Sequence, residues 1–168
     1  MPISMSQASV PRFAQMLRNL SAILAKAQAH CEARKIDPLV LTSARLYPDM
    51  FPLARQVQIA CDSAKGAAAR LAGVEAPKQE DTEKTFEELQ ARIGRTLDFI
   101  ASVKPAQIDG SEEREVVLKL RGRDVPFKGV QYLLGFAWPN FYFHVTTAYA
   151  ILRHNGVELG KADFLGGN

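Results

Sequence analysis

The chain has 168 residues, of which 47% are hydrophobic and 23% are charged, and its 21 Lys and Arg against 18 Asp and Glu give a net charge of +3. This length predicts one compact domain over residues 1–168. The ordinary composition excludes a disordered, a collagen-like or a disulfide-scaffold protein.

The N-terminal part predicts one long helix followed by an elbow. Ser9 is a candidate N-cap with Pro11 in the first turn, and apolar residues then recur every three or four positions to about Arg34. An Asp-Pro pair breaks this helix, and a short helical piece is expected over residues 39–46. Two prolines four residues apart then predict a non-helical elbow over residues 45–53.

Two further helices are expected in the middle of the chain. One runs from about Pro52 to Leu71 and ends at Gly73. The next is predicted to be capped by Asp81 or Thr82 and to end before Pro105. Its first turns carry acidic side chains, which the helix dipole favours, at Glu83, Glu87 and Glu88.

The C-terminal half predicts a hairpin and a fourth helix. Apolar residues alternate over residues 114–128, which is typical of a small β-hairpin, and one or two helical turns are expected over residues 128–136. The fourth helix is predicted from about Pro139 to His154, with Asn155-Gly156 as its C-cap. The tail is expected to pack back on the bundle through Val157, Leu159, Phe164 and Leu165. The predicted fold class is therefore an all-α four-helix bundle with a small inserted β-hairpin.

The segment Gly129–Leu152 contains no Asp, Glu, Lys or Arg over 24 residues and holds seven of the fourteen aromatic residues. Its length is that of a membrane span, but its proline and its polar side chains argue against one. The polar side chains include Gln131, Asn140, His144, Thr146 and Thr147. The segment therefore predicts a buried central helix, and no membrane partner is expected.

Other features limit the compartment and the partners. Residues 1–9 lack a basic region followed by an apolar one, so no signal peptide and a cytoplasmic location are expected. Cys31 and Cys61 lie in helical patterns without a CxxC motif and are interpreted as reduced, packed thiols. The basic residues are scattered rather than clustered, so nucleic-acid binding is not expected.

The charge-free helix is the predicted location of a site. At 100° per residue, one face of it collects Asn140, His144, Thr147, Ala148 and Ile151. His144 can be a ligand, a general base or a hydrogen-bonded core residue. On the second helix, Gln58 and Asp62 lie four residues apart on one face. Asp62 can be a ligand, a partner that orients His144, or a surface charge paired with Lys65 or Arg55.

Two other polar pairs are candidates, and several familiar motifs are excluded. Arg45 and Asp49 either pair to hold the elbow or bind a ligand, and Tyr149 and Arg153 form a possible pair on the fourth helix. The chain has no GxSxG, HExxH or GxGxxG motif, and its GxxxGKA segment is one residue too short for a phosphate loop.

Three segments carry a family resemblance: RLYPDMFPL from Arg45, QVQIACD from Gln56, and FYFHVTTAYAILRHNG from Phe141. Over nearly its whole length the chain resembles a bacterial domain-of-unknown-function family of the DinB-like (YfiT-like) superfamily. The resemblance implies a four-helix bundle, often dimeric, with a metal held by three histidines, one on the second helix and an HxxxH pair on the last. His144 matches the first histidine of that pair, Ala148 stands in place of the second, and Gln58 or Gln56 stands in place of the third.

We therefore expect a homodimeric DinB-like protein that binds a small molecule in an inter-helix pocket and has a degenerate metal site without a bound cofactor. The expected pocket residues are Arg45, Asp49, Gln58, Asp62, His144, Thr147 and Tyr149. If a divalent metal binds, His144 and Asp62 are its expected ligands. The alternatives are a metal-dependent hydrolase or thiol transferase with an altered ligand set, and a non-enzymatic homodimeric structural or interaction protein.

Overall fold

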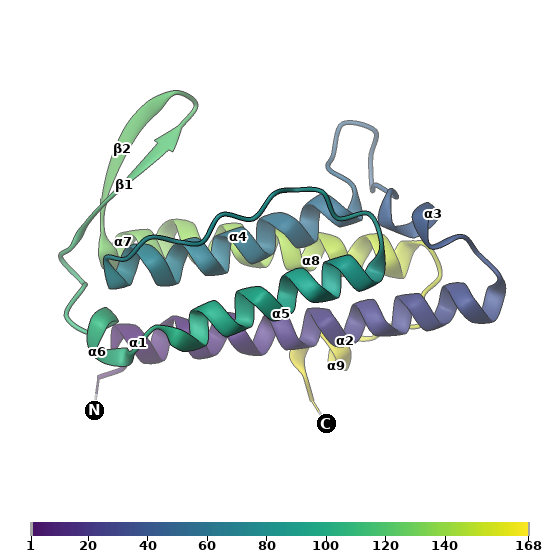
Figure 1. The fold of residues 1–168 in the computed structure, drawn as a ribbon, viewed down its shortest axis with the longest axis horizontal. Coiled ribbons are helices and arrows are strands. Elements are labelled where there is room, and N and C mark those ends of the chain that lie inside the picture. Colours follow the sequence, from purple (N-terminus) through teal and green to yellow (C-terminus); the bar gives the residue numbers. More distant parts are fainter. Residues whose placement is uncertain (1, 168) are drawn as a thin grey trace.

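The computed structural model describes residues 2–167, and four long helices form its body (Figure 1). They are α2 (Val10–Arg34), α4 (Leu53–Ala72), α5 (Phe86–Ser102) and α8 (Trp138–His154). A two-stranded antiparallel sheet is the only sheet in this part of the chain. The prediction of an all-α bundle with a small β-hairpin is confirmed.

The helices do not simply alternate in direction. Residues 73–85 carry the chain back along α4, so that α4 and α5 run the same way while α2 and α8 run the opposite way (Figure 1). A bundle with one such long crossover is a known variant of the fold. Packing contacts join α4 to both α8 and α5, and they join α2 to α5 and α8.

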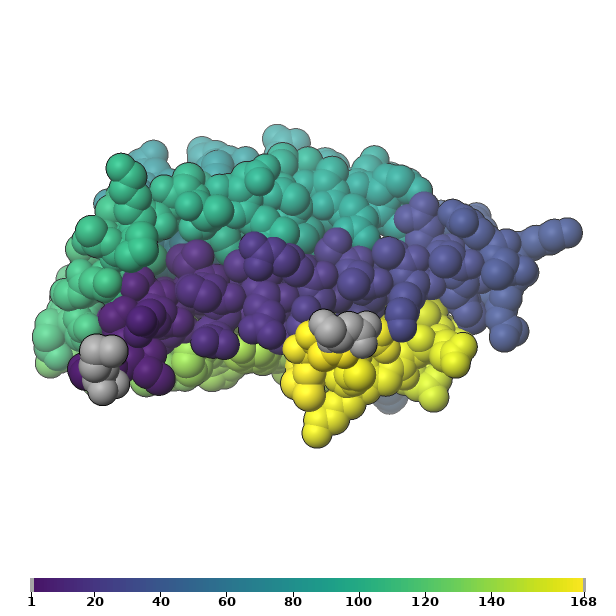
Figure 2. Space-filling view, turned by 90° about the horizontal axis from the view of Figure 1, so that it is seen from below, coloured from purple at the N-terminus to yellow at the C-terminus, as the bar shows by residue number. Residues whose placement is uncertain are grey.

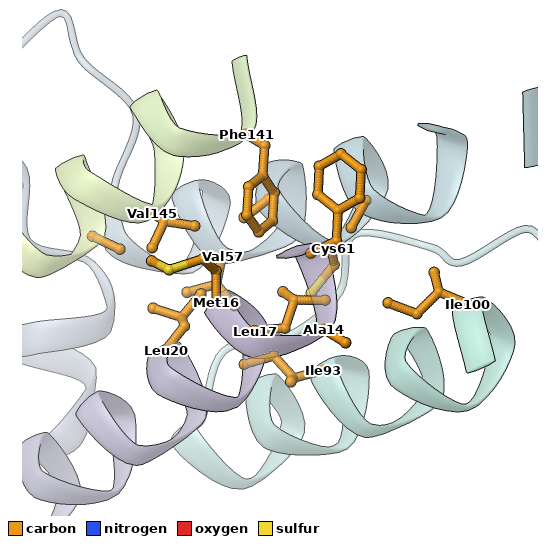
Figure 3. Packing of buried hydrophobic residues seen from close by; sticks show 14 of the residues in the cluster. Ala14, Met16, Leu17, Leu20, Val57, Cys61, Ile93, Ile100, Phe141 and Val145 are labelled. Carbon is orange, nitrogen blue, oxygen red and sulfur yellow. The ribbon is translucent and has the colours of Figure 1, made fainter. Parts of the chain in front are cut away.

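Each long helix contributes apolar side chains to one core (Figure 3). Leu17 of α2, Val57 of α4, Ile93 of α5 and Phe141 of α8 are each at most 1% exposed. Burial of one such side chain contributes about 1.5–3 kcal/mol. The ring of Phe13 meets that of Phe141 edge to face, with centroids 4.9 Å apart. No helix in the described residues combines the length and apolarity that a membrane crossing requires.

Of two predicted helix starts, the start of α2 after Ser9 is confirmed, although the Ser9 side chain bonds elsewhere, and the predicted start of the third long helix is wrong. A short helix, α1 (Met5–Ala8), precedes α2, and the Ser9 hydroxyl donates to the Met5 carbonyl at 2.7 Å instead of capping α2. Helix α5 is capped by Thr85, not by Asp81 or Thr82: the Thr85 hydroxyl accepts from the Glu88 amide at 3.2 Å, and Glu88 closes a capping box. Glu83 therefore lies in the crossover and not in the first turn of α5.

The predicted hairpin is confirmed as β1 (Glu115–Leu120) and β2 (Arg123–Lys128), with Leu120 opposite Arg123. The two turn residues have positive φ, 50° at Arg121 and 78° at Gly122, as the tightest hairpin turns require. Val116 and Leu118 face the bundle and are buried. The hairpin projects from the end of the bundle at which α4 ends and α7 begins (Figure 1).

The segment after the hairpin is helical throughout. Helix α7 (Gly129–Tyr132) leads into a π-helical segment, η1 (Leu133–Ala137), which continues directly into α8. The fourth helix thus begins at Trp138, one residue before the predicted start, and the expected one or two turns before it are joined to it. Single π-helical turns of this kind are frequent at functional sites.

Three short helices complete the fold. Helix α3 (Pro38–Thr42) ends earlier than the predicted piece at residues 39–46, and α6 (Pro105–Ile108) follows α5. Helix α9 (Lys161–Leu165) lies against α2, where the Asn19 side chain donates to the Phe164 carbonyl at 2.9 Å (Figure 2). In the tail Val157 and Leu159 are buried as predicted, whereas Leu165 is 53% exposed, contrary to the prediction.

Candidate functional site

Helix α8 turns the side chain of His144 toward α4, where it meets Gln56 and not Gln58. Nδ1 of His144 lies 2.6 Å from Oε1 of Gln56, and both side chains are buried. The Gln56 amide nitrogen donates to the Phe51 carbonyl at 3.0 Å, which turns Oε1 toward the imidazole. Since Oε1 can only accept, the hydrogen-bond network assigns the imidazole hydrogen to Nδ1 and leaves a lone pair on Nε2.

The surroundings of His144 keep its imidazole neutral. Burial, assisted by the positive charge of Arg55, lowers the pKa of His144 from 6.5 to about 4. The structure gives Nδ1 its Gln56 partner, while Nε2 has no hydrogen-bond partner among residues 2–167. At neutral pH, Nε2 is therefore a hydrogen-bond acceptor and a weak base.

A second polar contact between the same helices lies one turn earlier on α8. The Asn140 amide donates to the Ser63 hydroxyl at 2.7 Å, and that hydroxyl donates to the Ile59 carbonyl at 2.7 Å. The predicted shared face of Asn140 and His144 is confirmed, because both side chains bond to α4. Thr147, on the same face, donates to the Phe143 carbonyl of its own helix at 2.7 Å.

The residues present do not fit a three-histidine metal site. Gln56 replaces the imidazole that α4 would supply, and its carbonyl oxygen already accepts from His144. Ala148, on the buried side of α8, offers no donor atom. Asp62 Oδ1 bonds to Lys65 and Arg92, each at 3.0 Å. Over the described part of the chain, no three His, Cys, Asp or Glu side chains are arranged to hold a metal ion.

Asp62 belongs instead to a charge cluster around Arg92, whose side chain is fully buried. Arg92 Nη2 lies 3.0 Å from Asp62 and 2.9 Å from Asp81, and Nη1 lies 3.0 Å from Glu83 and from the Glu80 carbonyl. The cluster thus joins α4, the crossover and α5. In the sequence, this cluster is indicated by Arg92 itself, which lies at an inward-facing position of α5 next to Ile93 of the apolar stripe.

Gln58 and Arg55 extend this charge cluster. The Gln58 amide donates to Glu83 at 3.1 Å, so Gln58 faces the crossover and not His144. Arg55 forms an ion pair with Asp81 and lies over the Phe51 ring, with its guanidinium carbon 5.8 Å from the centroid. Of the alternatives for Asp62, the structure therefore favours the charge paired with Lys65, and it adds an ion pair with Arg92 that was not predicted.

The remaining predicted site residues lie elsewhere. Arg45 is exposed and holds the elbow by donating to the Met50 carbonyl at 2.7 Å, and Asp49 is exposed beside it without an ion pair to Arg45. The ring of Tyr149 packs edge to face on Phe164 of α9, with centroids 6.0 Å apart. The seven predicted pocket residues are thus divided among the elbow, the charge cluster, the buried face of α8 and the contact of α8 with α9, and they do not converge on one cavity.

A different cavity opens where the hairpin leans over the bundle. This hairpin groove has a volume of about 410 Å³ and is lined by α4, β1, α7, η1 and the first turn of α8. Ser63, Asn140 and Asp62 line its polar side. Tyr132 and Phe136 form an aromatic wall, with rings stacked at 20° and centroids 6.2 Å apart. Of the predicted pocket residues, only Asp62 lines this groove.

A four-helix bundle with this crossover, and with a histidine of its last helix facing the second long helix, defines a DinB-like protein. The chain belongs to the family described as Domain of unknown function (DUF1993), whose model matches residues 5–165. It is 43% identical to a DinB family member protein from Shewanella denitrificans, solved by crystallography at 1.83 Å resolution. The two structures align with a TM-score of 0.87 over 97% of this chain and 92% of that chain. A search of curated proteins found no match.

Proposed function

We propose that this DinB-like protein binds a small organic molecule in the hairpin groove and that its ancestral metal position has become the hydrogen-bonded pair of His144 and Gln56. The observation that carries the proposal is the groove itself. Its volume of about 410 Å³ falls within the range of ligand pockets, which is about 300–1,000 Å³. Such pockets combine apolar and aromatic walls with a few convergent polar groups.

The groove has both kinds of wall. On one side the hydroxyl of Ser63 and the amide of Asn140 present hydrogen-bonding groups that fix each other's orientation at 2.7 Å. On the other side lie the aromatic rings of Tyr132 and Phe136. Phe136 belongs to η1, and the extra residue of a π-turn shifts the side chains that follow it relative to a regular helix.

His144 does not line the groove but lies beyond it along α8. It lies one helical turn beyond Asn140, a rise of about 6 Å along α8. Its free Nε2 supplies an acceptor, whereas Asn140 supplies donors. His144 is therefore not counted among the groove residues, and its imidazole stays neutral at physiological pH.

A fragment screen observed through the protein's own amide resonances tests the proposal. Neutral, cationic and anionic aromatic fragments are titrated at millimolar concentration, and the shifted resonances are expected to cluster on α4, β1 and η1. Ile59→Trp adds an indole to a residue that lines the groove and should abolish these shifts. Val74→Trp, which adds the same group to the crossover, should not. Shifts that are scattered over the surface, or that persist in Ile59→Trp, refute the proposal.

The donor set also predicts the metal content. Protein purified without chelator is expected to carry less than about one-tenth of an equivalent of Zn, Ni, Fe or Mn, and His144→Ala should give the same value, because a lone imidazole binds such ions weakly. Near-stoichiometric metal that is lost in His144→Ala would favour the alternative of a metal-dependent hydrolase or transferase. Homodimer formation also stays a prediction, and a monomer in sedimentation equilibrium at micromolar concentration would contradict it.

A further inference from the structure

We propose that the ligand of the hairpin groove is an organic oxyanion, a carboxylate or phosphate on an aromatic or aliphatic body, and that Arg70 binds its charged group. This inference rests on the function proposed above and specifies the chemical class of the ligand. It follows from the charge balance of the groove, from the way in which Arg70 is held, and from the wall next to it.

The charge balance of the groove is positive. Three cations line it, at Arg55, Arg70 and Lys119, against the single carboxylate of Asp62. Asp62 is already neutralised by Lys65 and Arg92, and Arg55 by Asp81. In the described residues Arg70 and Lys119 have no carboxylate partner, so their charges are left for an incoming anion.

Neighbouring groups hold the guanidinium of Arg70 in place. Its Nη1 lies 3.1 Å from the Tyr132 hydroxyl, and its central carbon lies 5.8 Å from the Tyr132 ring centroid. Burial raises the pKa of the Tyr132 hydroxyl, so this phenol stays protonated. Gly66 lies one turn earlier on α4, and its lack of a side chain leaves room for the guanidinium of Arg70. A Cβ at position 66 would collide with that guanidinium.

A guanidinium held in this way suits an oxyanion. It has five N–H donors in a rigid plane, and Tyr132 engages only one of its nitrogens. The remaining donors match the two oxygens of a carboxylate or phosphate, and such charge-assisted bonds are roughly twice as strong as neutral ones. The same Tyr132 ring stacks on Phe136 in the groove wall, so the apolar body of the ligand would lie beside the charged group.

The hairpin adds to the positive potential. Arg121 and Arg123, at its turn, line a neighbouring hollow of about 710 Å³ together with Phe136, and the structure pairs neither with a carboxylate among residues 2–167. A concave surface of one charge sign raises the local concentration of oppositely charged ligands. These arginines would attract the anion, whereas Arg70 would bind it.

The central comparison of the test is between benzoate and benzamide, which differ in charge but hardly in shape. Benzoate and phenyl phosphate are titrated against the full chain in low salt beside benzamide, the neutral analogue of benzoate, and inorganic phosphate. Both aromatic anions are expected to shift groove resonances, benzamide to bind at least tenfold more weakly, and inorganic phosphate to be weaker than phenyl phosphate. The ratio between benzoate and phenyl phosphate then shows which oxyanion the site prefers.

Two pairs of variants isolate Arg70. Arg70→Gln should weaken anion binding about tenfold or more, since it removes the charge-assisted hydrogen bonds to the anion. Arg18→Gln, on the exposed side of α2, removes the same charge elsewhere and should leave binding unchanged. Gly66→Ala keeps the charge but displaces the guanidinium, so it should also weaken binding. Gly94→Ala, in α5, has open space around its new methyl group and should not.

The outcomes separate this inference from the proposed function. If benzamide and benzoate shift the groove resonances equally, small-molecule binding stands and the anion proposal fails. If no probe shifts these resonances, both fail. Equal losses of binding in Arg70→Gln and Arg18→Gln would mean that only net charge matters, and would overturn the role of Arg70. A Gly66→Ala variant that binds as tightly as the unmodified chain would also overturn that role.

Discussion

Replacing Arg92 by methionine should destabilise the protein more than any other single charge removal in the charge cluster. The Arg92 side chain is fully buried, and its two terminal nitrogens lie 2.9–3.0 Å from Asp62, Asp81 and Glu83. Methionine has a similar length and is tolerated in cores, so Arg92→Met removes mainly the charge and the hydrogen bonds. It leaves three carboxylates together without the cation at their centre.

The magnitude depends on which of these carboxylates can regain water. The side chains of Asp62 and Asp81 are each 39% exposed and can rehydrate. The side chain of Glu83 is only 6% exposed and cannot. Removal of one partner from a buried ion pair costs about 3–5 kcal/mol, and because Glu83 keeps contacts with Gln58 and Arg95 we expect the lower end, about 3 kcal/mol. For a chain of this size the melting temperature should fall by roughly 6–12 °C.

Urea denaturation at pH 7, followed by circular dichroism, measures this loss. Arg95→Met is the matched control, because Arg95 contacts the same Glu83 at 3.4 Å but its side chain is 54% exposed. An exposed pair contributes less than about 1 kcal/mol, so the control should be nearly neutral. The double variant Arg92→Met with Glu83→Met removes both charges and should recover part of the lost stability.

Equal losses in Arg92→Met and Arg95→Met would refute this reasoning, since exposure would then have no effect on the value of the pair. A double variant less stable than Arg92→Met alone would also contradict it. Amide hydrogen exchange adds a local measurement: in Arg92→Met the protection of residues 86–89, where the crossover enters α5, should fall first, because the crossover is released from both helices.

Three further predictions follow from single side chains. The pKa of His144 is about 4 in the folded chain and 6.5 in the unfolded chain, so between these pH values only the unfolded chain binds the proton. The free energy of unfolding should therefore fall by about 3 kcal/mol from pH 7 to pH 4. His144→Gln should lack this part of the decrease. Thr85→Ala should cost about 1 kcal/mol in urea denaturation, whereas Thr82→Ala should be neutral, and the reverse order would mean that α5 begins at the predicted cap. Burial raises the pKa of the Cys31 thiol, and that of the Cys61 thiol to about 12, so both should react with Ellman's reagent only as fast as the protein unfolds, and a rapid reaction in the native state would contradict this.

The charge cluster and the hairpin groove share Asp62 and Arg55, and this connects stability with the proposed binding. Asp62 lines the groove, but its negative charge is offset by Lys65 and Arg92. Without Arg92, the carboxylate would compete with an incoming anion for Arg70. Arg92 thus both anchors the crossover and offsets the charge of the one carboxylate that lines the groove.

The sequence alone was enough for the architecture, because the signals involved are local. Apolar spacing along four segments predicts the four helices, and the change to a period of two predicts the hairpin. Helical spacing also placed Asn140 and His144 on one face, and both contact α4. The RLYPDMFPL and FHVTTAYAILRHNG segments carried the family resemblance, and the family is confirmed.

What the sequence could not determine depends on how the helices are rotated against one another. Gln56 and Gln58 are two residues apart on one helix. Only the packing of α4 on α8 turns Gln56 toward His144, which lies 88 residues further along the chain. The start of α5 moved to Thr85 because Asp81 and Glu83 bond to an arginine on that helix, a contact that no local pattern encodes. The hairpin groove likewise exists only once residues far apart in the chain meet.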